Sequence, residues 1–214
     1  MAKLKRGIFG PVLGKIGGLV FSSWKGKNYA KKAAEPVKKG KKKQTPAQIN
    51  AQRKLVYVTR FLGPFQPYIT VGFMHMAEGQ TEINAANSYN YHDAFSGVYP
   101  DFAPILPNFK ISTGKLPMIK DIEIIKTSDD TVSLTWKKNA IKGTDWDDQL
   151  IMVLYSQELH EADGFIGGAR RSQEKYTFTF GEEISGKLVH VYFSLASTNR
   201  KYIAESIYWG TIQL

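Results

Sequence analysis

The stretch TVSLTWK at residues 131–137 alternates apolar Val132, Leu134 and Trp136 with polar side chains at every second position. Strict alternation with a period of two is typical of a β-strand that buries one of its faces. A second stretch, LIMVLYS at residues 150–156, is almost continuously apolar. Such a run predicts a central strand that is buried on both faces. Together the two stretches predict a β-sheet protein with one strand in the middle of its core.

Further stretches with strand-like patterns surround these two and extend the predicted sheet. They are short runs rich in apolar, β-branched and aromatic side chains, and turn-forming residues separate them. The runs are residues 119–126, 176–180, 188–196 and 203–212. Six or seven short strands in about 95 residues are typical of a β-sandwich. We therefore predict an α+β, mainly β protein in which residues 115–214 form a fibronectin III-like or Ig-like β-sandwich that folds on its own.

Residues 45–110 carry helix signals and are predicted to form a small helical connector. The sequence TPAQ at residues 45–48 is a capping box, with Thr as the N-cap and Pro where its missing N–H costs nothing. Thr81 is predicted to cap another helix that ends near Ser96. Behind the first cap, helical spacing predicts one apolar face made of Ala51, Leu55, Val58 and Leu62. Three prolines are typical of a linker ahead of the sandwich: Pro100, Pro104 and Pro107.

Positive charge is concentrated at the start of the chain. Residues 1–60 hold 16 Lys and Arg side chains against a single acid, Glu35, and therefore carry +15. The remaining 154 residues hold 13 basic and 18 acidic side chains and carry −5. This asymmetry predicts that residues 1–44 are a basic arm, rich in Gly and Lys, that meets nucleic acid or another polyanion.

The arm supplies the candidate binding residues. A hairpin turning at Lys25-Gly26 is expected, and residues 31–44 are expected to form an extended lysine-rich linker. Lysines neutralise phosphates without reading base sequence, and aromatic side chains stack on bases. The candidate nucleic-acid or anion-binding residues are Trp24, Tyr29, Lys25, Lys27, Lys31, Lys32, Lys38, Lys39, Lys41, Lys42 and Lys43.

The sequence lacks the residues that several kinds of catalytic and metal site require. There is no cysteine, which excludes disulfides, thiolate catalysis and Cys-based zinc sites. Asp145, Asp147 and Asp148 lack the spacing of an EF-hand, so a solvated turn is expected there. No nucleophile elbow or metal-ligand spacing of histidines is found. We therefore predict no enzyme, no cofactor, no metal site and no membrane span. With no export signal visible, the expected location is cytoplasmic or within a virion.

Several short motifs follow one another along the chain: Gly14-Lys15-Ile16-Gly17, Ser23-Trp24-Lys25-Gly26 with Tyr29, Thr45-Pro46-Ala47-Gln48 with Gln52-Arg53, Asn84-Ala85-Ala86 with Ser88-Tyr89-Asn90, and Tyr99-Pro100-Asp101-Phe102. Their order resembles a family of uncharacterised proteins common in Bacteroidota, which is known as a domain of unknown function. The resemblance covers nearly the whole chain, and it implies no activity and no catalytic residues. The TPAQ segment also has a weaker, local similarity to phage structural proteins.

Three functions are compatible with these observations. The first is a non-catalytic structural or assembly protein, as in a virion or phage-like particle, whose arm contacts nucleic acid or a neighbouring subunit. The second is a cellular protein that binds nucleic acid independently of sequence. The third is a carbohydrate binder or hydrolase that uses the sandwich loops. The first is our leading hypothesis, with protein partners or a homo-oligomer expected, because charge asymmetry is the strongest signal in the sequence.

Overall fold

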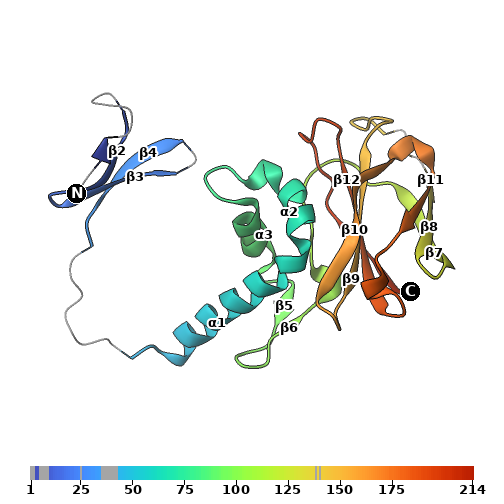
Figure 1. Cartoon of the computed structure of the whole chain (residues 1–214), viewed down its shortest axis with the longest axis horizontal. Helices are drawn as coiled ribbons and strands as arrows, with labels where there is room; N and C mark the ends of the chain where they lie inside the picture. Colours follow the sequence, from blue (N-terminus) through green and yellow to red (C-terminus); the bar gives the residue numbers. More distant parts are fainter. Residues whose placement is uncertain (1–2, 5–9, 25, 35–42, 138, 140) are drawn as a thin grey trace. The chain divides into compact units, whose positions relative to one another are not determined.

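The chain divides into two compact units, an N-terminal unit of residues 1–44 and a C-terminal unit of residues 45–214 (Figure 1). The structure is a computed structural model that describes residues 3–4, 10–24, 26–34, 43–137, 139 and 141–214. Within these residues it is mostly β-sheet, with three short α-helices. The boundary between the two units lies at residue 44, where the sequence also predicted one. The further boundary that the sequence predicted near residue 110 lies inside the C-terminal unit.

The N-terminal unit is an antiparallel sheet in which the four strands follow one another in chain order. Trp24 lies opposite Lys27, which confirms the predicted hairpin, and Gly26 adopts the positive φ of 76° that such a turn requires. The sheet is larger than the hairpin that the sequence predicted, and its last strand includes Lys31 and Lys32, which were placed in the linker. The strands are β1 (Lys3–Leu4), β2 (Val12–Ile16), β3 (Leu19–Trp24) and β4 (Lys27–Lys32).

Two of the helices of the C-terminal unit begin where the sequence predicted. The Thr45 hydroxyl accepts a hydrogen bond from the Gln48 backbone N–H at 3.3 Å, and the Gln48 side chain accepts one from the Thr45 N–H at 3.0 Å. This pair confirms the capping box. Thr81 likewise accepts from the Asn84 N–H at 3.2 Å. The helices are α1 (Pro46–Phe61), α2 (Gln66–Gly72) and α3 (Glu82–Asn90), and a small pair of strands follows, β5 (Phe95–Ser96) and β6 (Ala103–Pro104).

Two helix predictions need correction. The apolar face predicted for α1 is buried only in its second half, because Val58 and Leu62 are fully buried while Leu55 is 51% exposed. Helix α3 ends at Asn90 rather than near Ser96. The Asn90 side chain donates to the carbonyl of Lys110 at 3.0 Å and accepts from its N–H at 2.8 Å, so it ties the helix end to a distant segment.

The rest of the C-terminal unit is a β-sandwich of two antiparallel sheets. One sheet has the order β10-β9-β12-β13 and the other β11-β8-β7. The predicted stretches 131–137 and 150–156 match β8 and β9 closely. The strands are β7 (Lys120–Ser128), β8 (Thr131–Lys137), β9 (Gln149–Ser156), β10 (Glu161–Arg170), β11 (Lys175–Thr179), β12 (Leu188–Ala196) and β13 (Ile207–Gln213).

Strand β10 was not predicted from the sequence. Three glycines and Asp163 interrupt its apolar pattern, and glycine is normally depleted in strands. At Gly164, φ is 152°, and a Cβ there would lie 2.1 Å from the carbonyl oxygen of Met152 on β9. Glycine is therefore required for the close approach of β10 to its neighbour, although it hides the strand from pattern analysis.

Strand β9 lies between two hydrophobic cores and contributes side chains to both. It therefore joins the helices and the sandwich into one compact unit. Its residues Leu150, Met152 and Leu154 face the core between the two sheets. The alternate residues, from Ile151 to Tyr155, face a second core that is built with the helices. The predicted burial of this strand on both faces is confirmed. The proline-rich segment predicted as a linker instead contributes to the second core through Leu106, Phe109 and Ile111.

Trp136 lies in the core between the sheets, as predicted, and offers a test of that packing. It is 4% exposed, and its Nε1–H donates a hydrogen bond to the carbonyl of Arg171 at 2.9 Å. We expect Trp136→Phe to lower the free energy of unfolding by about 2–3 kcal/mol, because it leaves a small cavity and an unpaired buried carbonyl.

Chemical denaturation measures this change. The matched control is Trp146→Phe, because Trp146 is 66% exposed and its substitution should stay within about 0.5 kcal/mol of the parent. Equal midpoints for the Trp136 variant and the parent would contradict the packing described.

Candidate nucleic-acid interface

The strand register of the N-terminal unit decides which side chains share a face. Directly paired residues point to the same side of a sheet, and successive residues of one strand alternate. Trp24 pairs with Lys27, Ser22 with Tyr29, and Val20 with both Lys31 and Lys15. We call the side on which these residues lie the basic–aromatic face. Its described members are Leu13, Lys15, Val20, Ser22, Trp24, Lys27, Tyr29 and Lys31, and Leu13 is half-buried.

The side chains on this face are accessible. Trp24 is 50% exposed and Tyr29 is 46% exposed, and Lys15, Lys27 and Lys31 are all exposed. The two half-exposed aromatic rings therefore lie among three exposed lysines on one face, where their flat surfaces are open to a ligand. None of the described residues of the N-terminal unit is acidic. The positive charge of the face is therefore not neutralised by neighbouring carboxylates of the described part of the unit.

The opposite face of the same sheet has a different character. Ile16 is 53% exposed and Leu19 is 46% exposed, and Phe21 and Ala30 lie beside them in the register. Lys32 pairs with Leu19 and so belongs to this apolar face rather than to the basic–aromatic face. None of the residues described between 10 and 34 is buried. A sheet of this size normally needs an apolar face packed on something else, so the apolar face is suited to a protein contact.

The other predicted binding residues fall in two places. Lys43 is exposed and lies two residues before Thr45, the N-cap of α1. The remaining candidates lie outside the described residues: Lys25, Lys38, Lys39, Lys41 and Lys42. The sequence did not predict Lys15 as a binding residue, because it predicted a single hairpin, at Lys25-Gly26, within the Gly- and Lys-rich arm. The signal that could have found it is Gly17-Gly18, a two-residue turn between two apolar runs that are suited to strand pairing.

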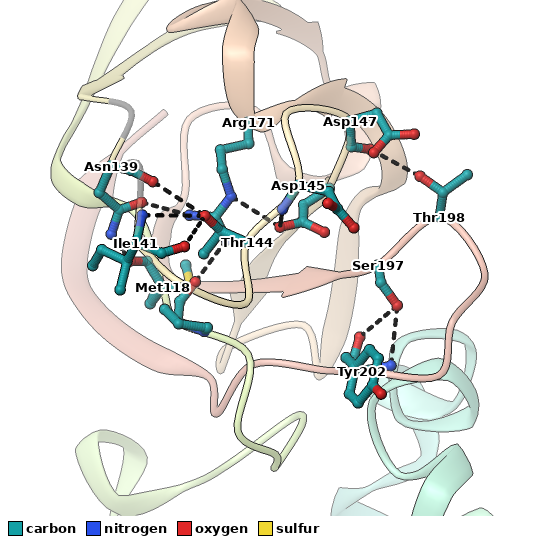
Figure 2. Close-up of polar contacts among 12 residues, drawn as sticks. Met118, Asn139, Ile141, Thr144, Asp145, Asp147, Arg171, Ser197, Thr198 and Tyr202 are labelled. Carbon is teal, nitrogen blue, oxygen red and sulfur yellow. Dashed lines mark hydrogen bonds and ion pairs between the residues drawn. The ribbon is translucent and has the colours of Figure 1, made fainter.

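The solvated turn predicted for the acidic loop between β8 and β9 is confirmed only in part, because Asp145 is exposed whereas Asp148 is buried. Asp148 is 1% exposed and Arg171 is 3% exposed, and the Arg171 Nε donates to the Asp148 Oδ2 at 3.0 Å. Figure 2 shows that the Arg171 side chain also reaches Asn139, whose Oδ1 accepts a hydrogen bond at 2.5 Å. The Asp145 N–H donates to the same Asp148 oxygen at 3.1 Å. Asp148 therefore holds the loop in place from inside.

A shallow pocket of about 270 Å³ lies between α1 and the β9–β10 hairpin, and His160 is one of its lining residues. The His160 Nε2 lies 3.2 Å from the Arg60 carbonyl oxygen, which can only accept, so Nε2 carries the proton. The Tyr155 hydroxyl lies 3.0 Å from Nδ1 and donates to it when the ring is neutral. Burial raises the pKa of Tyr155 to about 12, which keeps that donor protonated at neutral pH. Both ring nitrogens of His160 are thus engaged within the fold.

Among residues 3–4, 10–24, 26–34, 43–137, 139 and 141–214, no three His, Cys, Asp or Glu side chains are grouped so that they could hold a metal ion. Across the same residues, no helix has both the length and the apolar character needed to cross a bilayer.

A family model matches residues 10–210, and its description is a family of unknown function, DUF6266. The chain belongs to this family. Because the match begins at residue 10 and ends at residue 210, the DUF6266 model spans both the basic–aromatic face and the sandwich. The membership confirms the expected uncharacterised family.

Two other comparisons accompany the DUF6266 match. A search of curated proteins finds no match. Among solved structures, the chain is similar to the FN1–FN3 domains of chicken CNTN1, with 10% sequence identity and a TM-score of 0.35. That similarity covers 47% of this chain and 32% of that chain.

Proposed function

We propose that this chain is a non-catalytic assembly protein that binds nucleic acid, independently of sequence, through the basic–aromatic face of its N-terminal unit. The observation that carries the proposal is the gathering of Lys15, Lys27 and Lys31 with two exposed aromatic rings on one side of one sheet. Lysines at such a surface neutralise phosphates and release condensed counterions, which drives binding to any sequence. The lysine run at 38–43 adds further positive charge to the N-terminal unit.

The setting that we propose is a particle such as a virion or phage-like assembly. Its support is the apolar face on the other side of the same sheet, where Ile16 and Leu19 are about half exposed. One small sheet then serves two partners, a polyanion on one side and protein on the other. The sandwich would act as a scaffold of the fibronectin III kind, an inference that rests on its order of three strands against four.

A charge-removing variant tests the proposed binding. We expect Lys15→Gln, Lys27→Gln and Lys31→Gln together to weaken binding of any DNA sequence at low salt. The logarithm of the association constant should fall linearly with the logarithm of salt concentration, with a slope of about −0.9 for each phosphate neutralised on duplex DNA. The triple variant should flatten the slope by about 2–3 units. Fluorescence anisotropy of labelled DNA across a salt series measures both effects.

The matched control removes three equally exposed lysines from the C-terminal unit, through Lys142→Gln, Lys175→Gln and Lys201→Gln. It changes the net charge by the same amount and should keep the slope of the parent protein. A parent protein that binds no DNA at low salt would overturn the proposal. A control variant that flattens the slope as much as the first variant would assign the binding to net charge rather than to this face.

A cellular protein that binds nucleic acid is the second candidate, because the basic–aromatic face suits it equally. Assembly separates the two candidates. Static light scattering of an assembly protein should show a mass that rises with protein concentration, whereas the cellular alternative predicts a constant monomer. The apolar face, with Leu19 46% exposed, is the specific observation that favours assembly.

A further inference from the structure

We infer that the basic–aromatic face prefers single-stranded over duplex nucleic acid, because Trp24 and Tyr29 together form a stacking platform for two consecutive bases. This inference rests on the proposed function and narrows its ligand. Lysines alone do not distinguish the two forms, since both carry phosphates. Aromatic rings do, because the faces of bases are open in a single strand and covered by their neighbours in a duplex.

The strand register fixes the distance between the two aromatic positions. Trp24 lies directly opposite Lys27, and Tyr29 is two residues further along β4, so the two aromatics are diagonal neighbours on one face. Diagonal neighbours in an antiparallel pair are about 7–8 Å apart. Stacked bases in a duplex rise by about 3.4 Å per step. The distance between the two aromatic positions is about twice the rise between stacked bases. Two consecutive bases can therefore stack on both rings only after they have separated from each other.

Charged residues flank the two rings on the same face. Lys27 is the direct partner of Trp24, and Lys31 lies two residues beyond Tyr29 on β4. Lys15 lies on the neighbouring strand β2, opposite Val20 and on the same face. The phosphates of a strand whose bases lie on the rings would therefore meet lysines along its path. Aromatic residues on a sheet surface with lysines around them are the usual arrangement in proteins that bind single strands.

The side chains between the rings leave the platform open. Ser22 is the cross-strand partner of Tyr29 and precedes Trp24 by two residues, so it occupies the space beside both rings. Its side chain is small and polar, and it offers a hydroxyl to a base edge without covering either ring. A bulkier residue at this position would fill the surface that the bases need.

Anisotropy with a labelled oligothymidylate and with a labelled duplex, at one fixed salt concentration, tests the inference. We expect Trp24→Ala and Tyr29→Ala each to weaken binding of the single strand by about 5- to 150-fold, the range for loss of one base–aromatic stack. Binding of the duplex should change by less than about twofold, because the lysines remain. The salt dependence of single-strand binding should keep the slope of the parent.

Two control variants separate stacking from folding. Trp24→Phe keeps an aromatic face and should retain most of the single-strand affinity. Trp146→Ala should retain all of it, although Trp146, in the C-terminal unit, is even more exposed than Trp24. Oligothymidylate should also quench the part of the tryptophan fluorescence that is lost in Trp24→Phe. Quenching that persists unchanged in that variant would contradict the inference.

The outcomes distinguish this inference from the proposed function. A parent protein that binds neither probe at low salt would overturn both. A parent that binds both probes with equal affinity, or a Trp24→Ala variant that loses both alike, would overturn the single-strand preference and leave binding by charge intact. The expected pattern, a loss confined to the single strand, supports both.

Discussion

A fragment of residues 115–214 is expected not to fold on its own, although it contains all seven strands of the sandwich. The outer face of the sheet β10-β9-β12-β13 is apolar in the middle, with Ile151, Val153 and Tyr192 at most 1% exposed in the whole chain. These residues are covered by α1, α2 and the segment around Phe109. In the fragment they would meet water, and the hydroxyl of Tyr192 would lose the carbonyl of Leu106, which it reaches at 3.0 Å.

The size of this loss explains why we expect complete failure rather than a weakened fold. Burial of each large apolar side chain contributes about 1.5–3 kcal/mol, and domains are typically stable by about 5–15 kcal/mol. The missing segment supplies fifteen buried residues to the second core, from Val58 to Ile111. Removing their contacts to the sheet would offset most of the stability of the unit.

Amide NMR spectra of two fragments test this expectation. Residues 45–214 should give well-dispersed resonances, because this unit contains both cores. Residues 115–214 should give poorly dispersed resonances or precipitate. A dispersed spectrum from the shorter, monomeric fragment would mean that the helices are dispensable and that the boundary predicted near residue 110 is a true domain boundary.

The local elements of this fold could be predicted because their causes are local. The capping box at Thr45 depends on residues three apart, and the alternation in β8 depends on residues two apart. The continuous run in β9 correctly predicted burial on both faces. It could not say what lies on the second face, because helices and a second sheet bury apolar side chains equally well. For this reason the helices were assigned to a separate connector.

The candidate site was partly predictable for the same reason. Trp24, Tyr29, Lys27 and Lys31 stand close together in the sequence, and the hairpin that joins them follows from one turn. Their arrangement on one face, with Lys32 on the other, required the strand register. Lys15 comes from a strand that pairs through a second turn and was hidden in a glycine-rich segment.

Arg171 lies beyond the reach of sequence analysis altogether, and its substitution carries the second large prediction. Its guanidinium binds the Asp148 carboxylate, the Asn139 side chain and the carbonyl of Pro117, the last at 2.6 Å. These partners lie 23 to 54 residues away in the chain. Its own carbonyl accepts the hydrogen bond from Trp136. No local pattern marks a residue whose partners are this distant.

Arg171→Ala is expected to lower the free energy of unfolding by about 5 kcal/mol, the upper end of the range for breaking a buried ion pair. The change leaves the Asp148 carboxylate in the core at 1% exposure without its counter-charge. It also leaves the Pro117 carbonyl without the donor that it has in the parent. The Asp148 Oδ1 already accepts no hydrogen bond from the described residues, so the carboxylate has little else to stabilise it.

Chemical denaturation of a double-mutant cycle measures the pair itself. Arg171→Met with Asp148→Leu removes both charges and should cost less than Arg171→Met alone, because no uncompensated charge stays buried. The exposed pair Lys137–Asp121, with a distance of 2.9 Å, is the matched control, and Lys137→Met should change stability by less than about 1 kcal/mol. If Arg171→Ala cost no more than the control, the carboxylate would have to reach water, and the 145–148 loop would open more easily than this packing allows.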